Sequence, residues 1–249
     1  MNIFKKIYNH FYMYKHNKID VTDISKKTTK VRIIGDNNTV SILNKTKKNP
    51  KIIVKIDGYN NQVIIDDLNQ EFTGKLYIYI WGNNSSVKIG KNFSLGLNLS
   101  INLGDSSARD FKIDNVHCKI GENCRFEDVF IQTDNSNNTI SIGDNCLFSS
   151  DVNLYNTDSH PIFDKTTGKL INCVNDMKIG NSCWLGKGCS ILKGVTVPNG
   201  TIVGWKSVVS KSIDKEYCAV AGVPAKIVKE NVTWDKFASR EYIDNKKVF

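Results

Sequence analysis

Residues 179–213 read IGNSCWLGKGCSILKGVTVPNGTIVGWKSVVSKSI, and this stretch decides the fold. An aliphatic residue returns at every sixth position, namely Ile179, Leu185, Ile191, Val197, Val203 and Val209. Four positions after each of the first five comes a small or β-branched residue: Cys183, Cys189, Val195, Thr201 and Ser207. A period of six fits short strands separated by corners, with three hexads in each coil of a solenoid. We therefore predict an all-β solenoid whose aliphatic residues stack inside.

Glycine follows the aliphatic residue at Gly180, Gly186 and Gly204. Glycine adopts φ angles that other residues avoid. We therefore expect these three glycines to supply the unusual φ angles of the corners.

A second repeat, in the segments IIGDNNTVSI, KIDGYNNQVII and WGNNSSVKI, precedes the hexads. Gly35, Gly58 and Gly82 stand 23 and 24 residues apart. Asparagine tolerates the left-handed region and caps its own turn, so these segments predict wide coils with Asn-rich corners. We expect residues 19–88 to form irregular N-terminal coils that cap and lengthen the solenoid. The alternative is a role in binding the acceptor.

The regular coils are expected over residues 89–213, interrupted by a loop over residues 155–176 that contains NTDSHPIFDKTTGKLIN. Loops that leave a rigid scaffold commonly carry function. Short helices are expected at both ends. Apolar residues at helical spacing predict an amphipathic helix over residues 1–18, docked on protein or, alternatively, in peripheral contact with a membrane. Residues 214–249 are expected to form a turn followed by a charged tail.

Composition and charge indicate which binding partners and which cellular compartment to expect. The formal net charge is +9, but the lysines are scattered and no nucleic-acid motif occurs, which favours a phosphorylated small molecule over nucleic acid. The seven cysteines show no zinc spacing, and several fall at inward hexad positions, as free buried thiols would. With no signal peptide and no apolar run of about 18 residues, we expect a cytoplasmic protein. We expect no metal site, because only His117 and His160 lie in the solenoid and the cysteines lack zinc spacing.

The segments CWLGKGCSILKGV, VGWKSVVSKSI and AVAGVPAKIVKE resemble the hexapeptide-repeat acyltransferases, most nearly the O-acetyltransferases of bacterial polysaccharides and sialic acids. The resemblance covers roughly residues 120–229. It implies a left-handed parallel β-helix, acetyl-CoA as co-substrate, a carbohydrate acceptor, and a homotrimer with CoA between adjacent subunits.

The Asp-X-His-X-Ile pattern of the loop resembles the catalytic loop of these enzymes and makes His160 the expected general base. A histidine with an ordinary pKa near ~6.5 removes a hydroxyl proton and returns it to the departing thiolate. A carboxylate on the other ring nitrogen fixes the tautomer. Asp158 is the candidate, with Asp164 and residues of another subunit as alternatives. The alternative, that Asp158 only shapes the loop, is given the same weight as this tautomer-fixing role.

The family pattern places Trp184, which points outward, beside the acetyl group and the thiol end of acetyl-CoA, although a subunit contact also explains it. Gly186, Gly204 and Trp205 are expected in the same groove. Trp205 stands where the family usually has alanine, which narrows or rearranges that groove. The far end of the groove is assigned to Lys211, Pro224, Ala225 and Lys226, with the lysines near the 3′-phosphate.

These residues predict an acetyl-CoA-dependent O-acetyltransferase that acts on a sugar hydroxyl of a bacterial surface polysaccharide or its precursor. One alternative is an N-acetyltransferase of an amino-sugar nucleotide. The other is a β-helical scaffold without catalysis. The intact Asp-X-His and Gly-Val-Pro-Ala-Lys segments argue against the scaffold.

Overall fold

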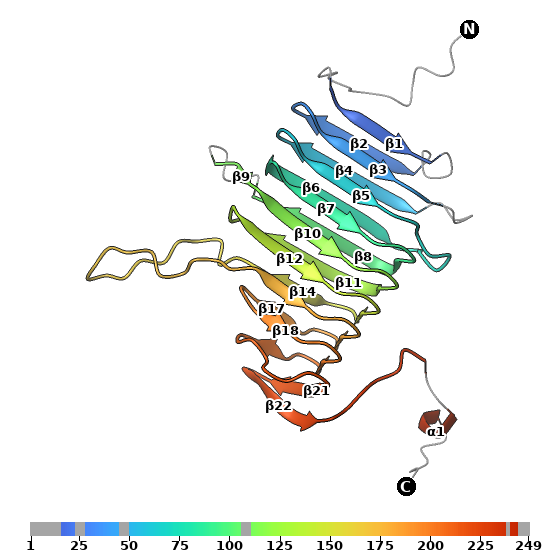
Figure 1. Ribbon diagram of the computed structural model, residues 1–249, viewed down its shortest axis with the longest axis vertical. Coiled ribbons are helices and arrows are strands. Elements are labelled where there is room, and N and C mark those ends of the chain that lie inside the picture. The colour runs from blue at the N-terminus through green and yellow to red at the C-terminus, as the bar shows by residue number, and fades with distance from the viewer. Residues whose placement is uncertain (1–15, 23–27, 45–49, 106–110, 238–239, 244–249) are drawn as a thin grey trace.

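The computed structural model describes residues 16–22, 28–44, 50–105, 111–237 and 240–243, and within them the chain winds into a stack of coils (Figure 1). The parallel pairing of successive coils confirms the predicted solenoid. The N-terminal helix expected over residues 1–18 lies almost wholly outside the described residues. Lys18 at its end already belongs to a strand, because it pairs with Thr39 of the next coil.

Eight strands form one sheet along the stack: β1 (Lys18–Val21), β3 (Thr39–Ile42), β5 (Gln62–Ile65), β7 (Ser86–Ile89), β10 (Val116–Ile120), β12 (Asn138–Ile142), β15 (Met177–Ile179) and β18 (Thr196–Val197). The second sheet follows the path β2 (Thr29–Ile34), β4 (Lys51–Asp57), β6 (Lys75–Asn83), β8 (Ser94–Leu103), β11 (Arg125–Thr133), β13 (Leu147–Phe148), β16 (Trp184–Leu185), β19 (Ile202–Val203), β21 (Cys218–Gly222) and β22 (Ala225–Glu230). Off this path lie β9 (Ile113–Asp114), β14 (Val152–Tyr155), β17 (Ser190–Leu192) and β20 (Val208–Val209).

The second sheet turns a corner within β8 and β11, so that the coil has three faces. Phe126 of β11 pairs with Phe148 of β13, whereas Ile131 of the same strand pairs with Leu154 of β14. We call the first sheet the first face. The second face comprises the first halves of β8 and β11 with β13, β16, β19 and β21. The third face comprises β2, β4, β6, the second halves of β8 and β11, β14, β17 and β20.

The six-residue period is confirmed in the C-terminal coils. Ile179 pairs with Val197, Leu185 with Val203 and Ile191 with Val209, so one coil takes 18 residues, or three hexads. All six of these side chains are at most 3% exposed. Burial of such side chains, roughly 1.5–3 kcal/mol each, stabilises the stack of coils.

The prediction that Gly180, Gly186 and Gly204 supply the unusual φ angles of the corners is wrong. The left-handed residues of the corners are Ser182, Gly188, Gly194, Gly200 and Lys206, each three positions after an aliphatic residue. At Gly186 the constraint is space instead, because a Cβ there would lie 2.6 Å from the carbonyl oxygen of Val203 in the next coil. The glycine therefore permits coils to approach each other.

The Asn-rich corners of the N-terminal coils behave as predicted. Asn37, Asn60 and Asn84 have φ between 51° and 57°. Beside them lies a buried ladder, in which the Oδ1 of Asn38 accepts from the backbone N–H of Asn61 at 2.9 Å. The Oδ1 of Asn61 likewise accepts from the N–H of Ser85 at 3.0 Å. These coils are wide but stay in strict register from β3 to β7, and the boundary expected at residues 88 and 89 falls inside β7.

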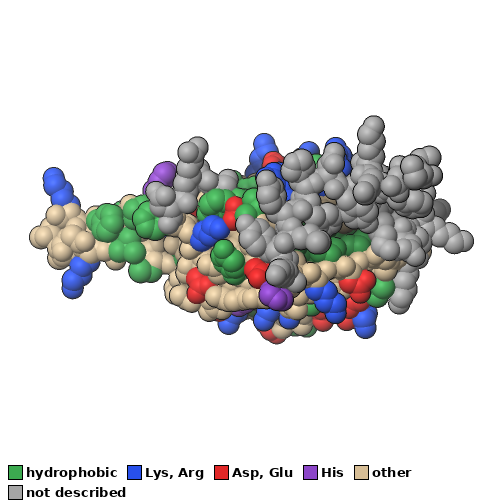
Figure 2. Space-filling view, turned by 90° about the horizontal axis from the view of Figure 1, so that it is seen from above, with side chains coloured by type: hydrophobic (Ala, Val, Ile, Leu, Met, Phe, Trp, Pro, Cys, Tyr) green, Lys and Arg blue, Asp and Glu red, His purple; other side chains and the backbone are tan. Residues whose placement is uncertain are grey.

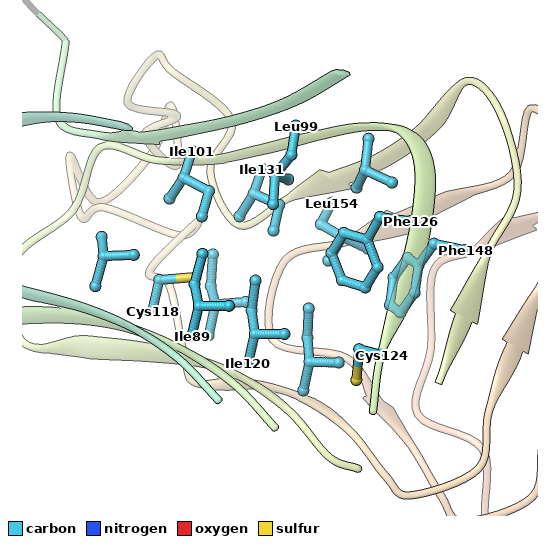
Figure 3. Close-up of a cluster of buried hydrophobic side chains, with 14 of the residues drawn as sticks. Ile89, Leu99, Ile101, Cys118, Ile120, Cys124, Phe126, Ile131, Phe148 and Leu154 are labelled. Atoms are coloured by element: carbon cyan, nitrogen blue, oxygen red, sulfur yellow. The ribbon is translucent and has the colours of Figure 1, made fainter. Parts of the chain in front are cut away.

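The core lies between the three faces along the stack. Figure 3 shows one part of it, where Ile89, Ile131 and Phe126 come together. Phe93, Phe126 and Phe148 contact one another in sequence, with ring centroids 5.2 and 4.2 Å apart. In register below Phe148 come Leu185 and Val203. Aromatic rings thus give way to smaller side chains where the coil shortens from 22 to 18 residues, because a narrower coil encloses less volume.

The cysteines are free thiols, as predicted, and all except Cys173 are buried. Burial raises the pKa of Cys118 and of Cys189 to about 12. These side chains therefore behave as small hydrophobic groups at neutral pH.

Two segments leave the stack. Residues 156–176 project from the side of the coils between β14 and β15 (Figure 1). At the C-terminal end, β21 and β22 form an antiparallel hairpin closed at Val223 and Pro224. The tail has neither helix nor strand from Asn231 to Phe237, and the short helix expected at this end is α1 (Arg240–Ile243). In the described part of the chain, no helix has the length and apolarity needed to cross a bilayer.

Candidate active site

The projecting loop is an arm held at its base. Asn156 is fully buried, and its Oδ1 accepts from the backbone N–H of Gly194 at 2.9 Å. Further out, Phe163 and Leu170 form an antiparallel bridge, so the two halves of the loop run side by side. Asp164, one of the alternative partners for His160, instead accepts from the N–H groups of Thr166 and Thr167, which closes the turn near the tip. The arm therefore has a defined shape.

His160 lies on this arm near its base. Its backbone N–H donates to the carbonyl of Asp158 at 2.7 Å, and its own carbonyl accepts from the Nδ2 of Asn172 at 2.9 Å. The residue is exposed, and its imidazole has no hydrogen-bond partner among the described residues. The backbone is fixed on both sides while the ring stays available, which suits a base that must meet a substrate.

Asp158 does not contact the ring of His160. Its Oδ2 instead accepts from the ammonium of Lys193, on the coil below, and from the Nδ2 of Asn172 at 2.8 Å. Lys193 first and Asn172 second hold the pKa of the Asp158 carboxyl below its ordinary value. Within one chain, this geometry favours the loop-shaping role over the tautomer-fixing role. Sequence reasoning missed Lys193 and Asn172, because nothing in the sequence indicates that either of them meets Asp158.

His117 offers a contrast. Its Nδ1 lies 2.9 Å from the Oγ of Ser86, and its Nε2 lies 3.0 Å from the Oδ1 of Asn115. Both ring nitrogens are therefore engaged on the first face. Burial, followed by the nearby charges of Lys119 and Lys88, lowers the pKa of this histidine. It serves as a polar element of the sheet.

A hollow of about 550 Å³ opens on the second face, and its lining includes Ser149, Lys187, Trp205, Lys236 and Phe237. Trp205 is 73% exposed there. Neither Lys187 nor Lys236 forms an ion pair with any described residue. An exposed indole and two uncompensated cations fit a ligand that carries both flat rings and phosphates.

The residues expected to contact acetyl-CoA are only partly brought together. Trp184 borders the hollow, since its Nε1 donates to the Oγ of Ser149 at 3.3 Å. Gly186 is buried between coils, and a Cβ on Gly204 would lie 3.1 Å from the Cβ of Ala221. These glycines therefore pack the coils. The remaining four residues lie toward the C-terminal end and do not line the hollow: Lys211, Pro224, Ala225 and Lys226.

The expected outward face of Trp184 is covered by the chain itself. Trp234 of the tail packs against it, with ring centroids 6.1 Å apart. The tail also supplies Lys236 and Phe237 to the hollow. Sequence reasoning missed this segment, because nothing in the tail marks where it returns to the coils.

Comparisons with known proteins identify relatives of this chain. No family model matches the chain. A polysialic acid O-acetyltransferase of Neisseria meningitidis is 35% identical over 192 residues, which are 72% of this chain and 87% of that protein. A polysialic acid O-acetyltransferase of Escherichia coli O1:K1 / APEC is 36% identical over 117 residues, which are 47% of this chain but only 37% of that protein.

Two solved structures of acetyltransferases are similar to the fold of this chain. The crystal structure of the polySia specific acetyltransferase NeuO superposes with a TM-score of 0.73 at 30% identity, over 89% of this chain and 88% of that one. The polysialic acid O-acetyltransferase OatWY gives a TM-score of 0.57 at 28% identity, over 87% of this chain and 96% of that one. The fold is therefore the left-handed parallel β-helix that the sequence resemblance implied.

Proposed function

This chain belongs to the hexapeptide-repeat O-acetyltransferases, and on that premise we propose that it transfers acetyl from acetyl-CoA to a hydroxyl of an anionic bacterial polysaccharide related to polysialic acid. The observation that carries the proposal is His160, whose backbone is fixed at both its N–H and its carbonyl. Its imidazole is exposed and has no hydrogen-bond partner in the described part of the chain. That arrangement offers a positioned base to an incoming hydroxyl.

The chemistry assigned to His160 is proton transfer in both directions. The imidazole takes the proton of the acceptor hydroxyl as that oxygen attacks the thioester carbonyl carbon. The C–S bond then breaks, and the imidazolium returns the proton to the departing thiolate. Asp158 acts as a positioning residue, because its bonds to Lys193 and Asn172 hold the stretch that carries His160. A carboxylate that faces the ring is assigned to a neighbouring subunit.

We assign acetyl-CoA to the hollow on the second face. The exposed indole of Trp205 and the neighbouring Trp184 suit the apolar part of the molecule, while Lys187 and Lys236 suit its phosphates. Lys211 and Lys226, at the C-terminal end, are kept as contacts of the 3′-phosphate together with the Pro224–Ala225 turn. Gly186 and Gly204 contribute by letting the coils approach below the groove.

The projecting arm supports a homotrimer. Ile162, Phe163 and Ile171 are 50%, 57% and 62% exposed on it, and Figure 2 shows hydrophobic side chains gathered along the projection. Apolar side chains grouped on a projecting segment call for a covering surface, and a second copy supplies one in a closed ring. Light scattering should give three times the chain mass, and a stable, fully active monomer would contradict the trimer.

The function is tested by measuring CoA thiol release from acetyl-CoA with polysialic acid, neutral polysaccharides, free sugars and sugar nucleotides as acceptors. We expect release with the anionic polymer and an acetyl group that mild alkali removes from the product, as an ester requires. Acetyl retained after alkali would show transfer to an amine. Thiol release that no acceptor stimulates would overturn the proposal.

A further inference from the structure

A second hollow, of about 570 Å³, lies on the third face over the N-terminal coils, far along the stack from the groove assigned to acetyl-CoA. Its lining includes Arg32, Lys55, Asp57, Tyr79 and Asn102. We propose that this hollow begins a docking track for the anionic acceptor polysaccharide, a proposal that rests on the function above.

The first argument is charge. Arg32 and Lys55 stand directly opposite each other on β2 and β4. Both side chains are exposed, and neither forms an ion pair with a described residue. Like charges in register destabilise a sheet, so an anion between them would offset that cost. Among the described residues of the lining, the one carboxylate is Asp57, and it is already paired with Lys112 at 2.6 Å, which leaves this part of the hollow cationic.

The second argument is the aromatic surface next to these cations. Tyr77 and Tyr79 alternate with buried residues on β6, so both project from the same face. Lys55 is in register with Tyr79. A half-buried tyrosine offers a flat apolar face and a hydroxyl with little loss of side-chain freedom, which suits a sugar ring.

The third argument is the register that leads from this hollow to the catalytic arm. One column of residues runs through successive coils as Arg32, Lys55, Tyr79, Asn102, Gln132 and Tyr155. These are five inter-strand steps, or about 24 Å at the usual strand spacing. Tyr155 ends β14, after which the chain enters the arm that carries His160. An acceptor lying along the column is therefore directed toward the arm that carries the base.

The column is also tied to the arm by hydrogen bonds. The Nε2 of Gln132 donates to both oxygens of Asp134, at 3.1 and 3.0 Å. The Oγ of Ser159, the residue before His160, donates to the Oδ2 of the same Asp134 at 3.2 Å. One carboxylate thus bonds both Gln132, in the column, and Ser159, the residue before His160, so the column and the base of the arm are linked.

The test compares two matched pairs of cations. In the double variant Arg32→Ala/Lys55→Ala, the KM for long polysialic acid should rise about tenfold or more, because charge-assisted contacts are lost. The KM for acetyl-CoA and the turnover with a very short oligomer should not change. The control is Lys88→Ala/Lys119→Ala, which removes an exposed in-register pair from the first face and should leave all values unchanged. Tyr79→Ala should raise the polymer KM, and Tyr79→Phe should restore most of it.

Direct binding of polysialic acid, measured by calorimetry without acetyl-CoA, separates this proposal from the function. If the polymer binds in a way that needs Arg32 and Lys55 but no acetyl is transferred, the docking track stands and the proposed function fails. If acetyl is transferred and both cation pairs behave alike, the track is overturned and the function stands. A change in oligomeric mass in Arg32→Ala/Lys55→Ala would also overturn it, since the face would then join copies of the chain.

Discussion

The indole of Trp234 packs against the indole of Trp184, with ring centroids 6.1 Å apart and planes inclined by 44°. The Nε1 of Trp234 also donates to the carbonyl of Ser182 at 2.6 Å. The tail is therefore attached beside the groove that we assign to acetyl-CoA, and it brings Lys236 and Phe237 to the lining. The contact thus joins two residues of this groove region that lie fifty positions apart in the sequence.

The first prediction concerns this attachment. Trp234→Ala should lower stability by about 1 kcal/mol through loss of the aromatic pair, and it should raise the KM for acetyl-CoA because Lys236 is no longer held in place. Trp234→Phe keeps an aromatic ring but loses the N–H donor, so its stability and its KM for acetyl-CoA should lie between those of the wild type and those of Trp234→Ala. Thermal unfolding and initial rates give the two readouts. An unchanged KM in Trp234→Ala would show that the tail plays no part in the groove.

The second prediction concerns the corners. Lys206 has φ of 51° at the position that Gly188, Gly194 and Gly200 occupy in other hexads. Lys206→Gly should remove about 1–2 kcal/mol of backbone strain and cost about 0.5–1 kcal/mol in entropy, a net gain of up to about 1.5 kcal/mol. The control Lys187→Gly, at a residue outside the left-handed region, should only lose stability. Urea midpoints that fall equally in both variants would refute the strain argument.

The third prediction concerns the base. His160→Ala should lower kcat by about 10²-fold or more and leave the KM for acetyl-CoA nearly unchanged, because proton transfer is lost and the groove is intact. The matched control is His117→Ala, which removes a histidine bonded to Ser86 and Asn115 and should keep its turnover. Turnover near the wild-type value in His160→Ala would remove this residue from the mechanism.

The fourth prediction separates the two roles weighed for Asp158. A positioning role allows a loss of up to about 10²-fold in Asp158→Asn, whereas an orienting carboxylate on the base is worth about 10⁴-fold. We expect the smaller loss, together with the same loss in Lys193→Met and no further loss in the double variant. A loss near 10⁴-fold in Asp158→Asn alone would assign it to the ring of His160.

The direction of the pKa shift of Asp158 predicts how its ion pair with Lys193 depends on pH. The pKa of Asp158 is lowered below 3.8 in the folded chain, so the tie to Lys193 is present above that value and is lost only as the pH falls through the lowered pKa. The ratio of wild-type to Asp158→Asn turnover should therefore be constant between about pH 5.5 and 8. A ratio that changes in this interval would mean that another group titrates with the pair.

The fifth prediction concerns the 3′-phosphate. If Lys226 reads this group, wild-type protein should bind CoA about 10- to 150-fold more tightly than dephospho-CoA. Lys226→Ala should erase part of that preference instead of weakening both ligands equally. Calorimetric titration of each ligand gives the comparison, and Lys211→Ala provides the parallel test. Equal affinity of the wild type for both ligands would show that neither Lys211 nor Lys226 reads the 3′-phosphate.

The sequence by itself determined the repeating part of this protein. The aliphatic column from Ile179 to Val209 predicts the stacked core because the six-residue period repeats the same environment in every coil, so each local choice is reinforced by its neighbours. Paired asparagines predict the N-terminal corners for the same reason. The interruption of the period near Tyr155 also marks the arm and His160 without any coordinates.

Only the tertiary structure decided the contacts between coils and segments that no period relates. The left-handed corner positions include Ser182 and Lys206 but not the predicted Gly186, whose place is set by the carbonyl of Val203 in the next coil. Lys193 meets Asp158, and Trp234 meets Trp184, across 35 and 50 residues of chain. The column from Arg32 to Tyr155 depends on which residues of successive coils pair across the strands. That register changes with the number of residues in each loop, so the spacing along the chain does not reveal it.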